Sequence, residues 1–204
     1  MDVTDVHHSY RRHTVLRGVG LQLRPGTLAG IVGENGAGKS TLLKILAGEL
    51  ALDRGTVRHS GRLGYCPQAV VLDDSFTVRQ HLDFFRHAFG LPDLRRAFEV
   101  MEILSFTEYL DHRAGLLSGG SRQKLNLTLA LMHDPDVLLL DEPYQGFDWE
   151  TYLRFWELAT SLRDAGRSVL VVSHLAYDID RLDALWRLDG GRLHLNDART
   201  EATA

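Results

Sequence analysis

One eight-residue segment constrains the fold of this chain more than any other. It consists of Gly33, Glu34, Asn35, Gly36, Ala37, Gly38, Lys39 and Ser40, with Thr41 next, and it matches the pattern G-x-x-x-x-G-K-[ST]. The apolar stretch 28–33 precedes it, and a helical pattern, STLLKILAGEL, follows it. Small residues let backbone N–H groups wrap a polyphosphate, and the helix points its positive end at the same place. The segment therefore predicts a phosphate-binding loop between a strand and a helix.

Four polar side chains would carry the chemistry of such a site. Lys39 offers a cation to the β- and γ-phosphates of a nucleotide, and Ser40 offers a hydroxyl to Mg²⁺. The apolar stretch 137–140 runs into Asp141 and Glu142, which places both carboxylates at the carboxyl edge of a sheet, where ligands bind in such folds. Asp141 can hold Mg²⁺, and Glu142 can polarise a water for attack on the γ-phosphate. Taken separately, the two segments could also be a glycine-rich turn and a solvated turn.

The pattern around these motifs predicts an α/β fold with a largely parallel sheet. Short runs rich in Val, Ile and Leu alternate with longer helical patterns. We expect buried strands at 28–33, 137–140 and 168–173, because these runs lack polar alternation. Residues 19–23 alternate apolar and polar side chains instead, which predicts an antiparallel N-terminal strand with one buried face.

The segment 75–133 is predicted to be a helical insertion between two strands of the main sheet. Thr77 could cap its first helix, and a second helix is expected over 93–104. A third helix starts at Ser118 and repeats apolar residues at i, i+4 and i+7. Those three residues are Leu125, Leu129 and Met132.

The composition is that of an ordinary globular chain of 204 residues. Apolar residues make up 44% and charged residues 25%, which excludes a disordered chain and a collagen. The net charge of −4 and the pI near 6.2 do not favour nucleic-acid binding, which usually needs a basic surface. We expect one domain over 1–204, with a polar tail at 196–204.

Cysteine content and hydropathy suggest a compartment. Cys66 is the single cysteine, so no internal disulfide can form, and a reducing compartment suits the chain. The first residues lack the apolar stretch of a signal peptide, and no apolar run approaches the ~20 residues needed to span a bilayer. We therefore expect a cytoplasmic protein that meets a membrane only through a partner. The ten histidines show no metal-ligand spacing and are expected to be surface or packing residues.

A third motif separates this chain from the many proteins with a phosphate loop. Leu117, Ser118, Gly119 and Gly120 open a helix between that loop and the acidic strand, and Ser118 stands 23 residues before Asp141. Alone, this would be a common helix cap. Together the three motifs resemble the nucleotide-binding subunit of an ATP-binding cassette (ABC) transporter of a small exporter-like type, over about residues 3–195. The resemblance implies a P-loop NTPase (RecA-like) core, an N-terminal antiparallel β subdomain, an inserted helical subdomain, and binding of ATP with Mg²⁺.

The resemblance assigns roles to further single residues. Gln68 matches the glutamine that senses Mg²⁺ and links the core to the helical subdomain. Asp148 matches the D-loop aspartate, and His174 matches the switch histidine that contacts the γ-phosphate. Tyr10 is the candidate for stacking on adenine, with His13 or a packing role as alternatives. Taken alone, the first three would be a loop glutamine, a helix cap and a structural histidine.

Two departures from the family pattern stand out. Ser121 follows the LSGG sequence, where glutamine is common. Tyr144, Gln145 and Phe147 occupy D-loop positions at which threonine, serine and leucine are commoner. Neither change removes a group that hydrolysis requires, although communication between subunits through the D-loop could differ.

The resemblance also implies how such a chain works. Two cassettes pair head to tail, either as a homodimer or with a homologous cassette, and Ser118 and Gly120 of one close over the γ-phosphate held by the other. Hydrolysis lets the dimer open. A separate integral membrane permease would dock on 75–133 and the Gln68 loop, at the inner face of the plasma membrane, and the compact chain favours export. Four phenylalanines are candidates for the apolar docking surface, although most also suit a core: Phe76, Phe84, Phe85 and Phe89.

Three other classes of protein compete with this interpretation. Soluble ABC ATPases that act on DNA, chromosomes or ribosomes usually carry two cassettes, coiled coils or zinc modules, and this chain shows none of these patterns. A small-molecule kinase would not need the LSGG sequence. A non-catalytic subunit would not need to retain Lys39, Asp141, Glu142 and His174.

Overall fold

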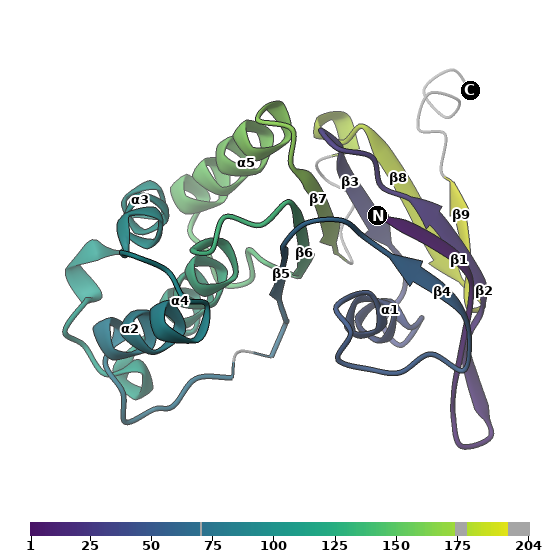
Figure 1. The fold of residues 1–204 in the computed structure, drawn as a ribbon, viewed down its shortest axis with the longest axis horizontal. Helices are drawn as coiled ribbons and strands as arrows, with labels where there is room; N and C mark the ends of the chain where they lie inside the picture. Colours follow the sequence, from purple (N-terminus) through teal and green to yellow (C-terminus); the bar gives the residue numbers. More distant parts are fainter. Residues whose placement is uncertain (70, 174–178, 196–204) are drawn as a thin grey trace.

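The computed structural model describes residues 1–69, 71–173 and 179–195 (Figure 1). A six-stranded sheet with the order β5-β6-β7-β3-β8-β9 lies at its centre. The first five of these strands run parallel to their neighbours, and β9 is antiparallel to β8. Their bounds are β3 Leu28–Val32, β5 Leu63–Cys66, β6 Val137–Asp141, β7 Ser168–Val172, β8 Ala184–Asp189 and β9 Arg192–Leu195.

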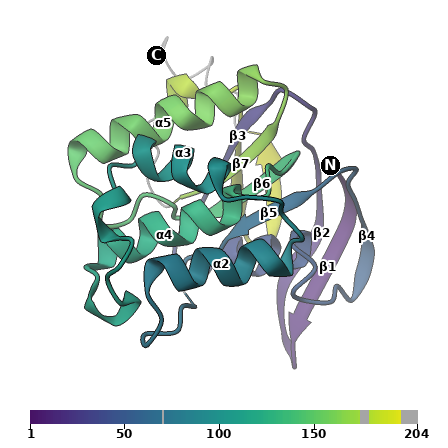
Figure 2. The ribbon, with the colours of Figure 1, turned by 60° about the vertical axis from the view of Figure 1, so that its left-hand side comes forward.

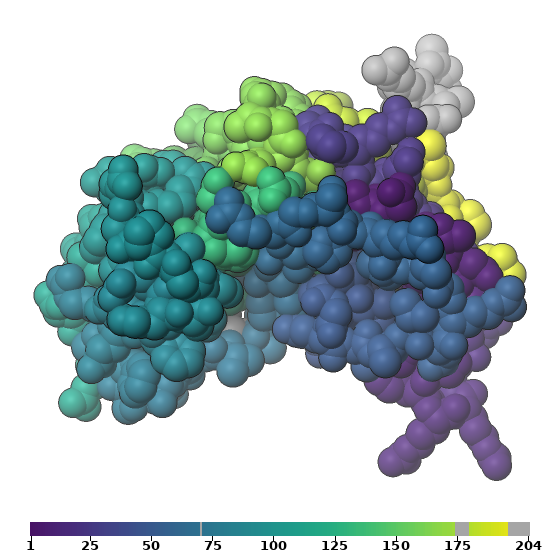
Figure 3. Space-filling model, in the orientation of Figure 1, coloured from purple at the N-terminus to yellow at the C-terminus, as the bar shows by residue number. Residues whose placement is uncertain are grey.

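A second, antiparallel sheet of three strands lies beside the main sheet, on the same side as helix α1 (Lys39–Leu46) (Figure 1). Its order is β2-β1-β4, formed by β1 Asp2–Tyr10, β2 His13–Gln22 and β4 Arg54–Arg58. The tip of the β1–β2 hairpin projects from the body of the molecule (Figure 3). The predicted N-terminal antiparallel subdomain is therefore confirmed.

Helices α2 (Val78–Ala88), α3 (Arg95–Ile103) and α4 (Gly119–Leu131) form the insertion between β5 and β6. Together with α5 (Trp149–Asp164), which connects β6 to β7, they cover the opposite face of the main sheet (Figure 2). The predicted cap is present, because the Thr77 hydroxyl accepts from the Gln80 N–H and the Gln80 side chain accepts from the Thr77 N–H. Short 3₁₀ turns lie at Thr107–Tyr109, Ala114–Leu116 and Ile179–Arg181.

The main sheet separates two hydrophobic cores. Along β6, Val137 and Leu139 face the core beneath α1 and the antiparallel sheet, while Leu138 and Leu140 face the core under the helices. This alternation follows from the two-residue period of a strand. Because both faces are covered, all five residues of β6 are buried, which is why the sequence shows an uninterrupted apolar run.

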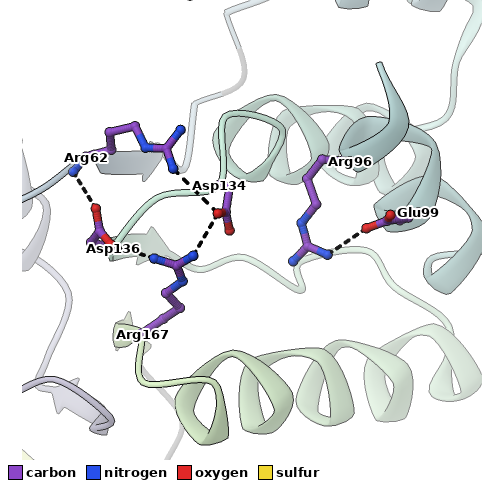
Figure 4. Close-up of polar contacts among 6 residues, drawn as sticks. All are labelled: Arg62, Arg96, Glu99, Asp134, Asp136 and Arg167. Atoms are coloured by element: carbon purple, nitrogen blue, oxygen red, sulfur yellow. Dashed lines mark hydrogen bonds and ion pairs between the residues drawn. The ribbon is translucent and has the colours of Figure 1, made fainter. Parts of the chain in front are cut away.

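An ion-pair cluster ties the amino ends of β5, β6 and β7 together (Figure 4). Arg167 bridges Asp134 and Asp136, and the backbone N–H of Arg62 donates to Asp136 over 2.8 Å. These groups are partly exposed, so water screens each pair and its contribution to stability is small. The cluster holds the end of the sheet opposite to the edge where Asp141 lies. A separate pair, Arg96 with Glu99, lies on α3.

Some expectations need correction. The strands predicted to run to Gly33 and Ser173 end one residue earlier, at Val32 and Val172. The core placement expected for most of the four phenylalanines is wrong, because Phe76, Phe84 and Phe89 are 39–61% exposed and only Phe85 packs against the core. They lie on and beside α2, which covers the sheet with one face only. The predicted tail 196–204 lies outside the described residues.

Candidate nucleotide-binding site

The phosphate loop owes its shape to its glycines. Gly36 and Gly38 have φ values of 82° and 103°, which residues with a Cβ rarely adopt. Gly38 also forms the amino-terminal cap of α1, so the backbone N–H groups that open this helix face the loop. Gly33 has no room for a Cβ, since one would lie 2.5 Å from the carbonyl oxygen of Leu188. The loop therefore passes between β8 and α1.

Lys39 is held over this loop. Its side chain is buried, and its Nζ donates to the carbonyl oxygens of Gly33 at 2.6 Å and Glu34 at 2.9 Å. These two contacts fix the ammonium group beside the N–H groups of the loop. A cation in that position favours a bound polyphosphate.

Two carboxylates face the lysine at the carboxyl edge of the sheet. Asp141 ends β6 and is 2% exposed, and Glu142 follows it at 7%. Burial raises the pKa of Asp141, and the negative charge of Glu142 raises it further. A hydrogen bond from Ser40 acts in the opposite direction and lowers this pKa. Glu142 adopts a φ of 50°, and its N–H donates to the carbonyl of Val172 over 2.9 Å.

This donor set fits a divalent cation. Carboxylate and hydroxyl oxygens are the ligands that Mg²⁺ prefers, and Mg²⁺ usually keeps several waters beside one or two carboxylates. Ser40 and Asp141 already contact each other through a hydrogen bond. A cation between them would relieve the repulsion that Asp141 experiences from Glu142.

These groups line one cleft of about 530 Å³. The hairpin residues Tyr10 and His13 form one wall, and Tyr10 is 49% exposed. Gln68, which follows β5, lines the same cleft. The structure thus brings together ten of the predicted residues and the alternative His13: Tyr10, Asn35, Gly36, Gly38, Lys39, Ser40, Thr41, Gln68, Asp141 and Glu142. Gly33, Glu34 and Ala37 belong to the loop but not to the cleft lining, and His174 lies outside the described residues.

The signature residues line a different cleft, of about 360 Å³. Ser118 caps α4, where its hydroxyl accepts from the Ser121 N–H and donates to the Ser121 hydroxyl. Asp148 caps α5 by accepting from the Thr151 N–H over 2.8 Å, and this bond lowers the pKa of Asp148. Gly120 packs so closely that a Cβ would lie 2.3 Å from the Gly146 carbonyl oxygen, whereas a Cβ on Gly119 would meet open space.

Among the residues that the structure describes, the two clefts share no lining residue. The signature serine therefore does not complete the phosphate site of its own chain in this conformation.

Sequence reasoning missed two polar contacts near the site. Asn126 of α4 donates from its side-chain amide to the Pro67 carbonyl over 2.8 Å, next to Gln68. Tyr144 donates to the Ser173 hydroxyl. Both contacts join residues far apart in the chain, so no local pattern reveals them. The sequence gives only weak signals for them: Asn126 is a polar residue within an apolar helix pattern, and Tyr144 is an unusual residue at its D-loop position.

A model of the ABC transporter family matches residues 16–145. The chain belongs to this family. Curated relatives agree: the Nod factor export ATP-binding protein I of Paraburkholderia xenovorans is 37% identical over 192 residues, covering 87% of this chain, and that of Ralstonia nicotianae is 34% identical, covering 94%. This chain spans 63% and 65% of the length of these two relatives.

Solved ABC proteins share the fold. The ATP-binding subunit of an ABC transporter superposes with a TM-score of 0.88 at 26% identity, over 96% of this chain and 90% of that one. A bacterial ABC transporter cassette solved as a dimer gives 0.85 at 22% identity, over 95% and 96%. The predicted fold, a P-loop core with an antiparallel β subdomain and helices, is confirmed by these ABC ATPase cassettes.

Proposed function

We propose that residues 1–204 form one cassette domain that binds and hydrolyses ATP with Mg²⁺ and powers a separate membrane permease. The observation that carries the proposal is the first cleft, where a buried lysine, two buried carboxylates, a hydroxyl and the phosphate loop converge. A kinase could share that cleft, but the signature helix and the family membership favour a cassette.

Each residue of the cleft has a distinct part in the proposed reaction. Lys39 and the loop N–H groups hold the β- and γ-phosphates, with Ser40, Asp141 and Gln68 holding Mg²⁺. Bound there, Mg²⁺ would neutralise charge that develops on the phosphates. Glu142 takes a proton from the attacking water, and His174 contacts the γ-phosphate. Tyr10 stacks on the adenine base.

A second copy of this chain would close the site. Ser118, Gly119 and Gly120 begin α4, whose N-terminal N–H groups favour an anion. Because Ser118 and Gly120 line a cleft of their own, they can meet the γ-phosphate of a partner, with Asp148 lining the same cleft. ATP would then hold the two chains together, and its cleavage would release them.

The permease would dock on a third, smaller groove of about 190 Å³. Phe85, Phe89 and Leu129 line it together with Pro67, so it lies between α2 and the segment that leads to Gln68. Asn126 also lines it and donates to the Pro67 carbonyl. An apolar element of the permease seated here would press on the segment that carries Gln68, which is how docking could reach the nucleotide.

The direction of transport follows from the relatives, which are named for export. The identity of the transported substrate does not follow from the relatives, since the cassette would act on the permease and not on that substrate. None of the helices among the described residues is both long and apolar enough to cross a membrane. We propose that the cassette sits on the permease at the cytoplasmic face.

Three assays test this proposal. Purified wild-type chain with Mg²⁺ and ATP should release inorganic phosphate, and Glu142→Gln should form a stable dimer with ATP that size-exclusion chromatography resolves. For docking, Phe89→Ser should weaken co-purification with the permease, whereas its melting temperature should change little, since exposed substitutions usually alter stability by about 0.5 kcal/mol or less. A wild-type chain that binds ATP but neither releases phosphate nor pairs would contradict the proposal.

A further inference from the structure

The turn after Glu142 carries a hydrogen bond that none of the roles above uses. The Tyr144 hydroxyl donates to Ser173 Oγ over 2.8 Å. Tyr144 follows Glu142 by two residues, and Ser173 directly precedes His174 in the sequence. The bond therefore joins the segment that carries the proposed base to the segment that leads to the proposed switch histidine.

This bond continues a link that the backbone begins. The parallel ladder between β6 and β7 ends at the pair Asp141 and Val172, and the Glu142 N–H donates to the Val172 carbonyl. Glu142 has a φ of 50°, which a residue with a Cβ adopts only when its surroundings hold it there. One backbone bond fixes a single point of the turn. The bond from Tyr144 fixes a second point and restrains how the turn pivots.

The ring of Tyr144 is itself held by α5. It packs edge-on against Tyr152 and Phe155, with ring centroids 5.2 and 5.5 Å away. Trp149, at the start of α5, is 72% exposed and stacks on Tyr152 at 5.5 Å. Asp148, which caps α5, lines the signature cleft. A chain of ring contacts therefore runs from the first turn of α5, beside the signature cleft, to Tyr144.

We propose that Tyr144 is a positioning residue for ATP hydrolysis. Its hydrogen bond to Ser173 sets Glu142 relative to the chain that leads to His174, and its ring couples that setting to the start of α5. The inference rests on the proposed hydrolysis at Glu142. Threonine, which is commoner at this place in the family, would supply a hydroxyl but no ring to pack against α5.

Steady-state phosphate release at varied ATP tests the proposal. We expect Tyr144→Phe, which keeps the ring, and Ser173→Ala, which removes the other end of the bond, each to lower kcat by about three- to tenfold. KM for ATP should stay within about twofold, because neither side chain contacts the nucleotide in this scheme. The double variant should be no slower than either single variant, since all three lack the same bond. Ser173→Thr keeps the hydroxyl and should keep kcat.

Ser161→Ala is the matched control. It removes a hydroxyl bond of the same 2.8 Å length, donated to the Leu158 carbonyl within α5 and away from both clefts, and should leave kcat unchanged. The inference is overturned if Tyr144→Phe and Ser173→Ala both retain wild-type kcat, or if their effects multiply in the double variant. A wild-type chain that binds ATP without releasing phosphate overturns the proposed function, and this inference with it.

Discussion

The phosphate-loop cleft and the signature cleft are built in different ways. In the first, Lys39, Asp141 and Glu142 are each at most 8% exposed, so the fold itself confines their charges. In the second, Ser118 and Asp148 lie exposed at the starts of two helices and act as ordinary caps. We propose that the first cleft holds a nucleotide with one chain, whereas the second offers the N-terminal N–H groups of α4 to a partner. Variants of the two clefts should therefore fail at different steps.

The largest effect is expected at the base. Glu142→Gln should slow phosphate release by about 10²–10⁴-fold, the usual contribution of a positioned general base. ATP binding should persist, because the amide has the shape of the carboxylate and removes a negative charge beside the phosphates. Phosphate release and nucleotide titration measure the two quantities separately. Hydrolysis at the wild-type rate would show that Glu142 is not the base.

The next largest effect separates the two clefts directly. Lys39→Ala should weaken ATP binding to the single chain by about 10- to 150-fold, since a charge-assisted hydrogen bond contributes roughly 1.5–3 kcal/mol. Ser118→Asp keeps a good helix cap but opposes a phosphate with a negative charge. It should leave binding to the single chain intact and abolish ATP-dependent pairing. Nucleotide titration of the monomer measures ATP binding, and light scattering measures pairing. An equal loss of ATP binding by the two monomeric variants would contradict the separate roles of the two clefts.

Asp141 should show a conflict between stability and function. Its pKa is raised, chiefly by burial, so its charge opposes folding at neutral pH when no cation is bound. Asp141→Asn keeps an acceptor for Ser40 and should raise the melting temperature, by about 2–4 °C for each kcal/mol gained. It should also lose the additional stabilisation that Mg²⁺ gives in the presence of ATP. A lower melting temperature would mean that Asp141 is needed for folding.

The smallest effect lies outside both clefts, at His133. Burial lowers the pKa of His133, whose Nε2 contacts the Leu63 carbonyl over 3.1 Å. A lowered pKa means that the unfolded chain binds this proton more readily, so stability is present above about pH 6.5 and falls below it. His133→Gln keeps an N–H donor and should lose less stability than wild type between pH 7.5 and 5.5. Urea unfolding at several pH values measures the free energy of unfolding of both proteins. The same change of that free energy with pH in the two proteins would contradict the prediction.

The sequence predicted the residues of the first cleft better than the long-range contacts around that cleft. The phosphate loop, the apolar strand and the two acidic residues after it are each determined by short stretches of sequence. The positions of Lys39 and Asp141 therefore follow from the amino-acid sequence alone. Ser118 could be placed as a cap for the same reason. That its cleft excludes the phosphate loop was implied only by the family resemblance, because no local pattern shows how α4 packs on the sheet. The Asn126 and Tyr144 contacts span 59 and 29 residues, and only the folded chain brings them together.

The central claim is that each nucleotide site takes its two halves from different chains, and mixing two variants tests it most directly. Lys39→Ala and Ser118→Asp are each expected to be inactive alone. In a mixed dimer, one site carries both changes and the other carries neither. Neither variant is expected to pair with itself around ATP, so the dimers that form are mixed and half of their sites are intact. An equal mixture should therefore recover phosphate release up to about half of the wild-type rate. A mixture no faster than the mean of the two separate variants would contradict the account.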